Sequence, residues 1–591
     1  MTRISATGPC WGRSWLAAAG LMLAGVAAVA APGDATAPCH TVSGTAELRA
    51  VLALPAGEKS GLRVCLAPGR YDLKTPDFRG AFTGLDPDRP IIFEAADPAD
   101  PPVLTRWVFA SGPEGGENGD AILRDLVVLL DDVPEVPPGE TGFRGHRYGV
   151  AMGVGGVTRN VTLERLTVTG SLGEARLGAP ELERNLTGIN GLRLRNVTIR
   201  DSRLERLGSG IIVGGTDITV TGNRMRHSWG DMLRISPQVH EGGCSDTEGV
   251  TVTRNMVYDH WANNRLHPDV IHMFASHNVA CAVRNLTIAE NLAFPGVGLW
   301  QPARPTGVKP TVPSRPPARL PEGNRVFHIL QGAGIRELPP ADCAEERILI
   351  GVQRDGTYEG DETAPLRLVP PPGDRVAEGQ SHRHEIALTR PWQTVRLTCD
   401  PKRPGTWKAA PSLPAMQGVF TNSLPDGAGF ENVLIRHNIL WVTAPAAVSF
   451  RDADNRGITV MQNTFLQPLP GDRDGDGQAN TVLDGVNMRF PTSRVVLQNG
   501  RDLAVHRTLS GGPPARKSRA GQSGKVQQPP RGQEAGRYFA ALPGPTLMPE
   551  TPQDAVALAR PRPGRVSPGT GAVAATPDGD PVDWSWVATP W

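Results

Sequence analysis

Short runs in which apolar and polar residues alternate recur through the middle of the chain. The first reads Asn-Val-Thr-Leu from Asn160, and the later runs keep its form. They begin at Asn196, Asp217, Gly249, Asn285, Asn432, Gly457 and Ser493. A period of two with β-branched residues predicts short strands with one buried face. Because such a unit buries that face only against its neighbours, their repetition predicts a solenoid.

Most of these strands are followed by an asparagine at a fixed offset. The asparagines are Asn223, Asn255, Asn291, Asn438, Asn463 and Asn499. Asparagine tolerates the left-handed αL conformation, and its amide can hydrogen-bond from coil to coil. A second strand recurs within each coil, at Gly210, Asp231, Asp269 and Ala447. The pattern predicts an all-β protein, a right-handed parallel β-helix, and disfavours a sandwich of unrelated strands.

Ahead of the repeats, residues 41–53 predict a short amphipathic capping helix with Ser43 or Thr45 as N-cap. Leu62-Arg-Val-Cys-Leu, Pro68-Gly-Arg-Tyr and Ile91-Ile-Phe-Glu follow it. This order of helix, strand and Pro-Gly-x-Tyr turn resembles the start of chondroitinase-B-like and alginate-lyase-like chains of the pectin-lyase-like superfamily. The resemblance covers roughly residues 41–500 and implies the β-helix fold. Its motifs are architectural and leave the reaction open.

The chain begins with a basic, then apolar, segment that ends in Ala28-Val29-Ala30. This is typical of a cleaved signal peptide over residues 1–30, so we expect a secreted or periplasmic protein. The apolar run is short for a membrane span, and no later segment is apolar enough to be one. The net charge is +1, so bulk charge indicates no nucleic-acid partner.

The repeat divides the rest of the chain. Residues 39–301 are expected to form the N-terminal cap and coils, and residues 417–500 the C-terminal coils. Between them, residues 302–416 lose the repeat and predict a Pro-rich, disulfide-pinned β insertion. Residues 501–591 predict a Pro/Gly-rich, largely irregular tail, in which Trp584, Trp586 and Trp591 could dock.

Six cysteines lie beyond the signal peptide, and an even number in an exported chain favours disulfides. Their order suggests three local pairs, with free buried thiols as the alternative. The pairs are Cys39 with Cys65, Cys244 with Cys281, and Cys343 with Cys399. No Cys-x-x-Cys spacing indicates zinc.

Titratable residues are densest between positions 226 and 272. Aligning Gly210-Ile-Ile-Val, Asp231-Met-Leu-Arg and Asp269-Val-Ile-His places Asp231 beside Asp269 and Arg234 beside His272. The same alignment puts Ile212, Leu233 and Ile271 in one inward ladder. Nearby loops add Arg226, His227, His260, Asn263, Asn264, Arg265 and His267. Equivalent positions on successive coils lie about 4.8 Å apart, so this set could form one site.

These residue types suit β-elimination of a polysaccharide that contains uronic acid. The reaction needs a base at C5 and a group that neutralises the adjacent carboxylate. Arg234 could bind the carboxylate, and His272 or His267 could act as the base. Asp231 and Asp269 could orient the histidine or hold a Ca²⁺ ion. Further substrate contacts are expected from Arg226, His260, Asn264 and Arg265.

The leading prediction is therefore a monomeric polysaccharide lyase. A lysine base is disfavoured, because the chain has no lysine between Lys74 and Lys309. The same parts could run C5 epimerisation, although His267-Pro268-Asp269 departs from the Asp-Pro-His-Asp motif of alginate epimerases. Asp231 and Asp269 could instead act as the acid and base of a glycoside hydrolase. A non-catalytic glycan-binding solenoid, whose cluster only satisfies turn backbone, also stays open.

A second candidate metal site is Asp472-Arg-Asp-Gly-Asp-Gly. Carboxylates at Asp472, Asp474 and Asp476 match the first half of an EF-hand-type loop, although Leu483 stands where the loop's glutamate belongs. The spacing predicts a structural Ca²⁺ site, with a solvated acidic turn as the alternative. We assign it no catalytic role.

Overall fold

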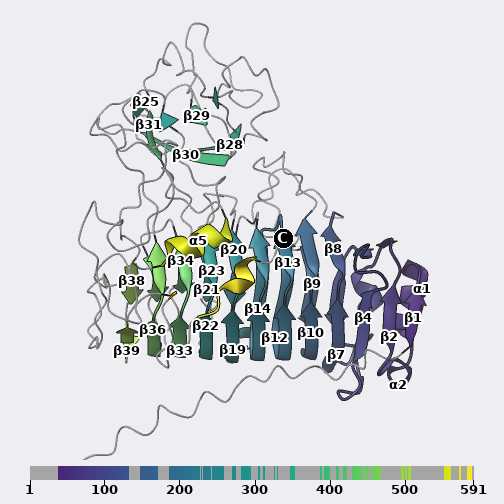
Figure 1. The fold of residues 1–591 in the computed structure, drawn as a ribbon. Coiled ribbons are helices and arrows are strands. Elements are labelled where there is room, and N and C mark those ends of the chain that lie inside the picture. The colour runs from purple at the N-terminus through teal and green to yellow at the C-terminus, as the bar shows by residue number, and fades with distance from the viewer. Residues whose placement is uncertain are drawn as a thin grey trace, which may run out of the picture. The chain divides into compact units, whose positions relative to one another are not determined.

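The computed structural model describes most of the coils and parts of the tail. The described residues are 38–131, 147–170, 186–226, 228, 230–240, 243–258, 269–273, 281–294, 417–421, 429–442, 446–450, 455–466, 551–560, 572–573 and 582–588, together with isolated strands between 304 and 411 and between 494 and 506. They belong to one compact unit, Pro38–Trp591. Its strands form a 20-stranded and a 10-stranded sheet by parallel pairing (Figure 1), which confirms the predicted parallel β-helix. No described helix is long and apolar enough to cross a membrane.

A coil contributes a short strand and, before it, either one long strand or two shorter strands in its place. Strand β12 (Leu186–Arg200) pairs with β14 (Ser209–Thr221), and β13 (Arg203–Glu205) pairs with β15 (Arg224–Arg226). The long strands turn at a residue with positive φ, which is Asn196 in β12 and Asp217 in β14. A coil therefore presents three faces, two from the long strand and one from the short strand.

We number these faces along the coil. Face 1 holds the first half of each long strand and continues through β16 (Leu233–Ile235), β21 (Asp269–Met273), β32 (Gln417–Thr421) and β35 (Ala446–Phe450). Face 2 holds the second half and continues through β19 (Thr247–Thr253), β22 (Val283–Ala289), β33 (Phe430–Arg436) and β36 (Asn455–Met461). Face 3 contains β13, β15, β20 (Met256–Tyr258), β23 (Leu292–Phe294), β34 (Ile439–Trp441) and β37 (Thr464–Leu466).

The core is built from the inward residues of these strands. In face 2, for example, Val197, Ile218 and Val250 stack on one another with 1% exposure or less. Their outward neighbours, such as Thr219, remain partly exposed. Burial of each such side chain contributes about 1.5–3 kcal/mol. The alternation seen in the sequence is therefore the inside–outside alternation of the coils.

An asparagine ladder follows the corner between face 2 and face 3. The buried ladder comprises Asn223, Asn255, Asn291, Asn438 and Asn463, and each side-chain amide donates to the next Oδ1 at 2.9–3.0 Å. The coil-to-coil bonds are as predicted, but the αL turn is not made by these asparagines. The residue before each one takes the positive φ, as Arg254 and Glu290 do. The ladder side chain then turns inward, where the next coil satisfies it.

The N-terminal end carries the predicted capping helix, α1 (Thr45–Ala53), with two differences. Its N-cap is Gly44 rather than Ser43 or Thr45, and it begins four residues later than predicted. The preceding residues form β1 (Cys39–Val42), which pairs with β2 (Arg63–Leu66). The predicted disulfide joins these strands, with 5.9 Å between the Cα atoms of Cys39 and Cys65.

The predicted bridge between Cys244 and Cys281 is also present, with a Cα–Cα distance of 6.1 Å. The insertion contains antiparallel strands, among them β28 (Glu346–Val352), β29 (Ile386–Leu388) and β30 (Trp392–Cys399). The pairing of Cys343 with Cys399 lies outside the described residues.

Two short helices of the tail are described. Helix α5 (Pro552–Leu558) and the short 3-10 helix η2 (Ser585–Ala588) lie over face 3 (Figure 1). Trp584 is 6% exposed and packs in a separate hydrophobic cluster with residues of three face-3 strands. Those residues are Met256, Tyr258, Leu292, Phe294, Ile439 and Trp441. Trp584 and Trp586 therefore dock, and Trp591 lies outside the described residues.

Candidate active site

Strands β16 and β21 bring four of the predicted site residues together on face 1. Arg234 lies opposite His272, as expected. The inward neighbours of the site are Leu233 and Ile271, and Ile211 continues their ladder. The sequence alignment was wrong here by one residue, because it placed Ile212 in that ladder. Ile212 instead lies opposite Arg234, and a one-residue shift in register exchanges the two faces of a strand.

The Asp231 carboxylate is the centre of the cluster. Its Oδ2 lies 2.7 Å from His272 Nδ1 and accepts hydrogen bonds from Arg234 Nη2 at 2.5 Å and Nε at 3.1 Å. Asp269 Oδ2 is 3.6 Å from the same His272 nitrogen. Asp231 therefore holds a histidine and an arginine side by side, with a second carboxylate against the histidine.

Most of this cluster is buried. Asp231 is 7% exposed, Asp269 0% and His272 4%, whereas the side chain of Arg234 is 31% exposed. Of these four side chains, only that of Arg234 is substantially exposed. A ligand would meet Arg234 first.

Electrostatics keep Asp231 ionised. Burial alone would raise the pKa of its carboxyl, but the charge and hydrogen bond of His272 act against burial. Arg234 adds a second charge and hydrogen bond, and the pKa of Asp231 falls well below its ordinary value of 3.8. Asp231 is therefore a permanent acceptor at neutral pH, suited to orienting a histidine and unsuited to donating a proton.

The cluster was tested as a metal site. Asp231, Asp269 and His272 each offer a ligand atom, and these atoms lie within 4.8 Å of one another. Ca²⁺ prefers six to eight oxygen ligands. Here one donor is an imidazole nitrogen, and the Asp231 carboxylate already binds the Arg234 cation. The donors among the described residues therefore do not fit Ca²⁺.

The remaining predicted residues lie elsewhere. Arg226 is on face 3, where its Nε is 2.7 Å from Glu205 Oε2. His260, Asn264, Arg265 and His267, and the predicted calcium loop Asp472, Asp474 and Asp476, lie outside the described residues.

Sequence reasoning missed Phe420. It lies opposite His272 on β32, and the two ring centroids are 5.6 Å apart. In space it is the next rung of the stack, but the insertion separates it from β21 in sequence. The signal that could have found it is the Gly-Val-Phe run after Gln417, which matches the spacing of the face-1 strands.

Comparison with known proteins adds little to this geometry. No family model and no curated protein matches the chain. Among solved structures, the chain is similar to a PL6 family polysaccharide lyase from Pseudopedobacter saltans, with 8% identity. The similarity covers 79% of this chain and 92% of that one, with a TM-score of 0.22. At this level the likeness carries no argument about function, so the case rests on the cluster itself.

Proposed function

We propose that this chain is an exported polysaccharide lyase that cleaves an acidic, uronic-acid-containing polysaccharide by β-elimination. The observation that carries the proposal is the shared contact of Asp231 Oδ2 with His272 Nδ1 and Arg234 Nη2. It places a candidate base and a candidate carboxylate-binding group next to each other. The segment over residues 1–30 supports export.

The chemistry assigns one role to each side chain. Arg234 pairs with the uronate carboxylate and stabilises the negative charge that develops when the C5 proton is removed. His272 takes that proton on Nε2, because Nδ1 is engaged by Asp231, and this buried nitrogen must become accessible when the substrate binds at Arg234. The electron pair forms the C4–C5 double bond, and the C4–O bond breaks with the glycosidic oxygen as the leaving group. That oxygen then receives a proton from His272 or from water.

Asp231 is a positioning residue in this scheme. An ionised carboxylate on Nδ1 fixes the imidazole tautomer and stabilises the imidazolium that forms, as in other histidine–aspartate pairs. Asp269 adds a second negative charge 3.6 Å from the same nitrogen. Both carboxylates stabilise the positive charge that the ring acquires during proton transfer.

The same geometry disfavours hydrolysis. A glycoside hydrolase needs one carboxylic acid that keeps its proton near neutral pH. Asp231 is ionised, with its pKa held down by His272 and Arg234, so it cannot be that acid. C5 epimerisation needs the same base and the same arginine, and the two reactions differ in product.

The test is a panel of acidic glycans, comprising alginate, pectate and glycosaminoglycans, with the neutral glycan xylan as control. Ultraviolet absorbance of the unsaturated product from one acidic glycan is the expected result. His272→Gln should abolish it, whereas His437→Gln, which changes a buried histidine of a face-2 corner, should leave it intact. New reducing ends without absorbance, or altered uronate stereochemistry without cleavage, would replace the lyase by a hydrolase or an epimerase.

A further inference from the structure

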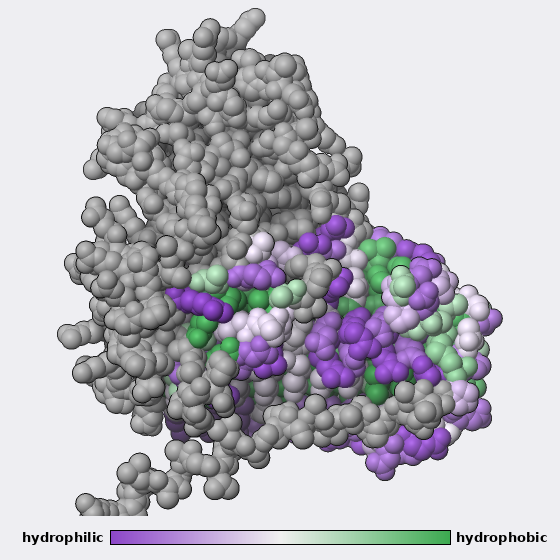
Figure 2. Space-filling view, in the orientation of Figure 1, coloured by the Kyte–Doolittle hydropathy of each residue, from purple (hydrophilic) through white to green (hydrophobic). Residues whose placement is uncertain are grey.

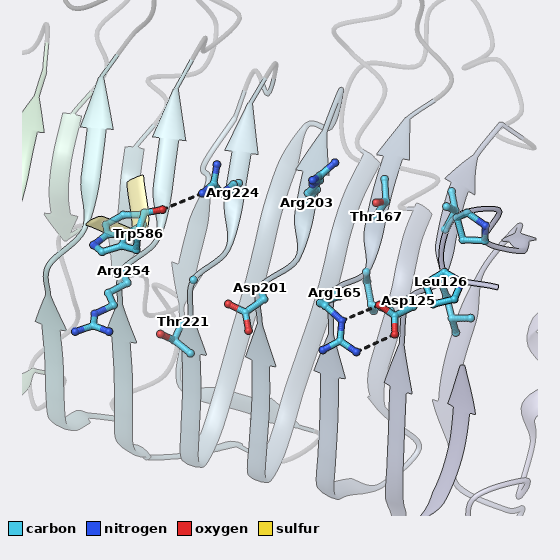
Figure 3. A pocket seen from close by; sticks show the side chains of 15 residues that line it. Asp125, Leu126, Arg165, Thr167, Asp201, Arg203, Thr221, Arg224, Arg254 and Trp586 are labelled. Atoms are coloured by element: carbon cyan, nitrogen blue, oxygen red, sulfur yellow. Dashed lines mark hydrogen bonds and ion pairs between the residues drawn. The ribbon is translucent and has the colours of Figure 1, made fainter. Parts of the chain in front are cut away.

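A second polar site lies away from the β16–β21 cluster, at the corner between face 2 and face 3 (Figure 3). It is a pocket of about 680 Å³, within the range of about 300–1,000 Å³ that is typical of ligand sites. We call it the corner pocket. Its lining includes Arg165, Arg203, Arg224, Arg254, Asp201 and Trp586. In Figure 2 hydrophilic residues gather on this side of the coils.

Two of the four arginines form ion pairs with residues of neighbouring coils. Arg165 forms a two-pronged contact with Asp125, at 2.7 and 2.8 Å. Arg254 Nε lies 2.8 Å from Glu290 Oε2. These pairs belong to the corner row of positive-φ residues and frame the pocket.

The other two arginines lie side by side on adjacent strands. Arg203 and Arg224 lie opposite on β13 and β15. Arg224 is 8% exposed, and its Nη2 donates to the carbonyl oxygen of Trp586 at 3.0 Å. Burial, followed by the charge of Arg203, lowers the pKa of Arg224, whereas Tyr258 and Asp201 act in the opposite direction. Like charges opposite each other on a sheet are unfavourable, so an anion bound between them would stabilise the pair.

Arg203 is the cation best placed to receive that anion. Its side chain is exposed, and it makes no ion pair within the described part of the chain. The corner row carries a glycine here, Gly222, with φ of +68°. A Cβ at this position would lie 2.3 Å from Asp201 Oδ1. The missing side chain therefore leaves room for the Asp201 carboxylate at the edge of the pocket.

The tail supplies an aromatic wall. The ring of Trp586 is stacked on that of Trp584, with 5.9 Å between centroids, and Trp584 is buried. The partly exposed Trp586 indole is therefore held in place beside Arg224. A flat apolar surface next to fixed cations suits a ligand with an apolar ring face and an anionic edge.

We propose that the corner pocket binds a segment of an acidic oligosaccharide, with its carboxylates at Arg203 and Arg224 and one ring against Trp586. Successive coils are about 4.8 Å apart, and one pyranose unit has a similar length. Successive carboxylates can therefore meet arginines on successive coils. The net charge of +1 disfavours a nucleic acid as the ligand. The pocket stands independently of the proposed lyase reaction.

The experiment is calorimetric titration of the full chain carrying His272→Gln, so that ligand is not consumed. Tetrasaccharides of galacturonate, of mannuronate and of guluronate are the acidic ligands, and xylotetraose is the neutral one. Binding of an acidic tetrasaccharide that weakens with added salt is expected. Arg203→Glu should weaken it at least about tenfold, whereas Arg79→Glu should not. Arg79 is the matched control, because it is exposed and has no ion pair among the described residues.

Trp586→Phe and Trp586→Ala separate stacking from folding. Phe should retain most of the affinity and Ala should lose it, at unchanged unfolding temperature. Equal binding of xylotetraose, tighter binding of a single-stranded oligonucleotide, or wild-type affinity in Arg203→Glu would each overturn the proposal. Failure of the lyase assay together with loss of binding in Arg203→Glu would overturn the reaction and leave the pocket standing.

Discussion

The buried asparagine ladder and the β16–β21 cluster are both stacks of polar side chains on neighbouring coils, yet they differ in kind. In the ladder the same residue recurs, and Asn255, Asn291 and Asn438 each donate to the next coil and accept from the previous one. In the cluster the residue changes from rung to rung, and Asp231, Arg234 and His272 join opposite charges.

The difference separates structure from candidate chemistry in a solenoid. In a repeated stack, the amide of each asparagine finds its hydrogen-bond partner in the next coil and needs no ligand. Repetition of the same residue therefore indicates a stabilising role. A base beside a cation, with an ionised acceptor between them, contributes nothing to stacking that an asparagine would not supply. Positions where the residue type changes from one coil to the next are therefore better candidates for a functional site than positions where it repeats.

Asp231→Asn is the change with the largest expected effect, and it tests whether the β16–β21 cluster is catalytic or structural. An amide cannot hold the imidazole in the tautomer that leaves Nε2 as the base, so kcat should fall by roughly a hundredfold or more. Steady-state kinetics on the cleaved glycan, with circular dichroism to verify the fold, measures this. Unchanged kcat with a lower unfolding temperature would make the cluster structural.

The complementary change is Asn291→Ala in the middle of the ladder. The backbone N–H and side-chain amide of Asn255 lose their acceptor, and a buried unsatisfied group costs about 1–3 kcal/mol. The free energy of unfolding in urea should fall by that amount, while the kcat of the folded enzyme stays unchanged. The surface substitution Thr219→Ala, on the outward side of face 2, serves as control. A variant as stable as the wild type would remove the structural role of the ladder.

The smallest effect is expected from His437, a buried corner histidine whose Nε2 lies 3.1 Å from Gln462 Oε1. Burial, then the charge of Arg436, lowers its pKa from the ordinary 6.5. As the pH falls below 6.5 the unfolded chain takes up the proton first, so stability should decline by at most about 1.4 kcal/mol per pH unit. His437→Gln, which places the residue of the next coil at this position, should make the free energy of unfolding less dependent on pH below 6.5. An unaltered slope would assign this pH dependence to other groups.

The fold could be predicted from the sequence because each coil repeats the same short pattern of neighbouring residues. Alternation fixes which side chains point inward, and the asparagine spacing marks the corners. It failed where a single position decides the register, as at Ile212, since a glycine and two isoleucines in a row fit either face. The αL residue was likewise misplaced by one, because aspartate, arginine, glutamate, histidine and glutamine all occupy that position.

The candidate site was foreseen in part. Asp231, Arg234, Asp269 and His272 could be aligned, because each pair lies at the same spacing within its strand. The burial of three of them could not, because it depends on segments distant in the sequence. The corner pocket was invisible for the same reason, since Arg224 and Trp586 are 362 positions apart.

The docked tail also imposes an order on assembly. Coils can stack one after another as the chain emerges, each on the rung before it. The apolar residues of face 3 from Met256 to Trp441, however, become covered only when Trp584 and Val587 pack on them. Until then the apolar residues of face 3 are exposed to solvent. A chain shortened before Trp584 should therefore aggregate rather than fold into a smaller solenoid.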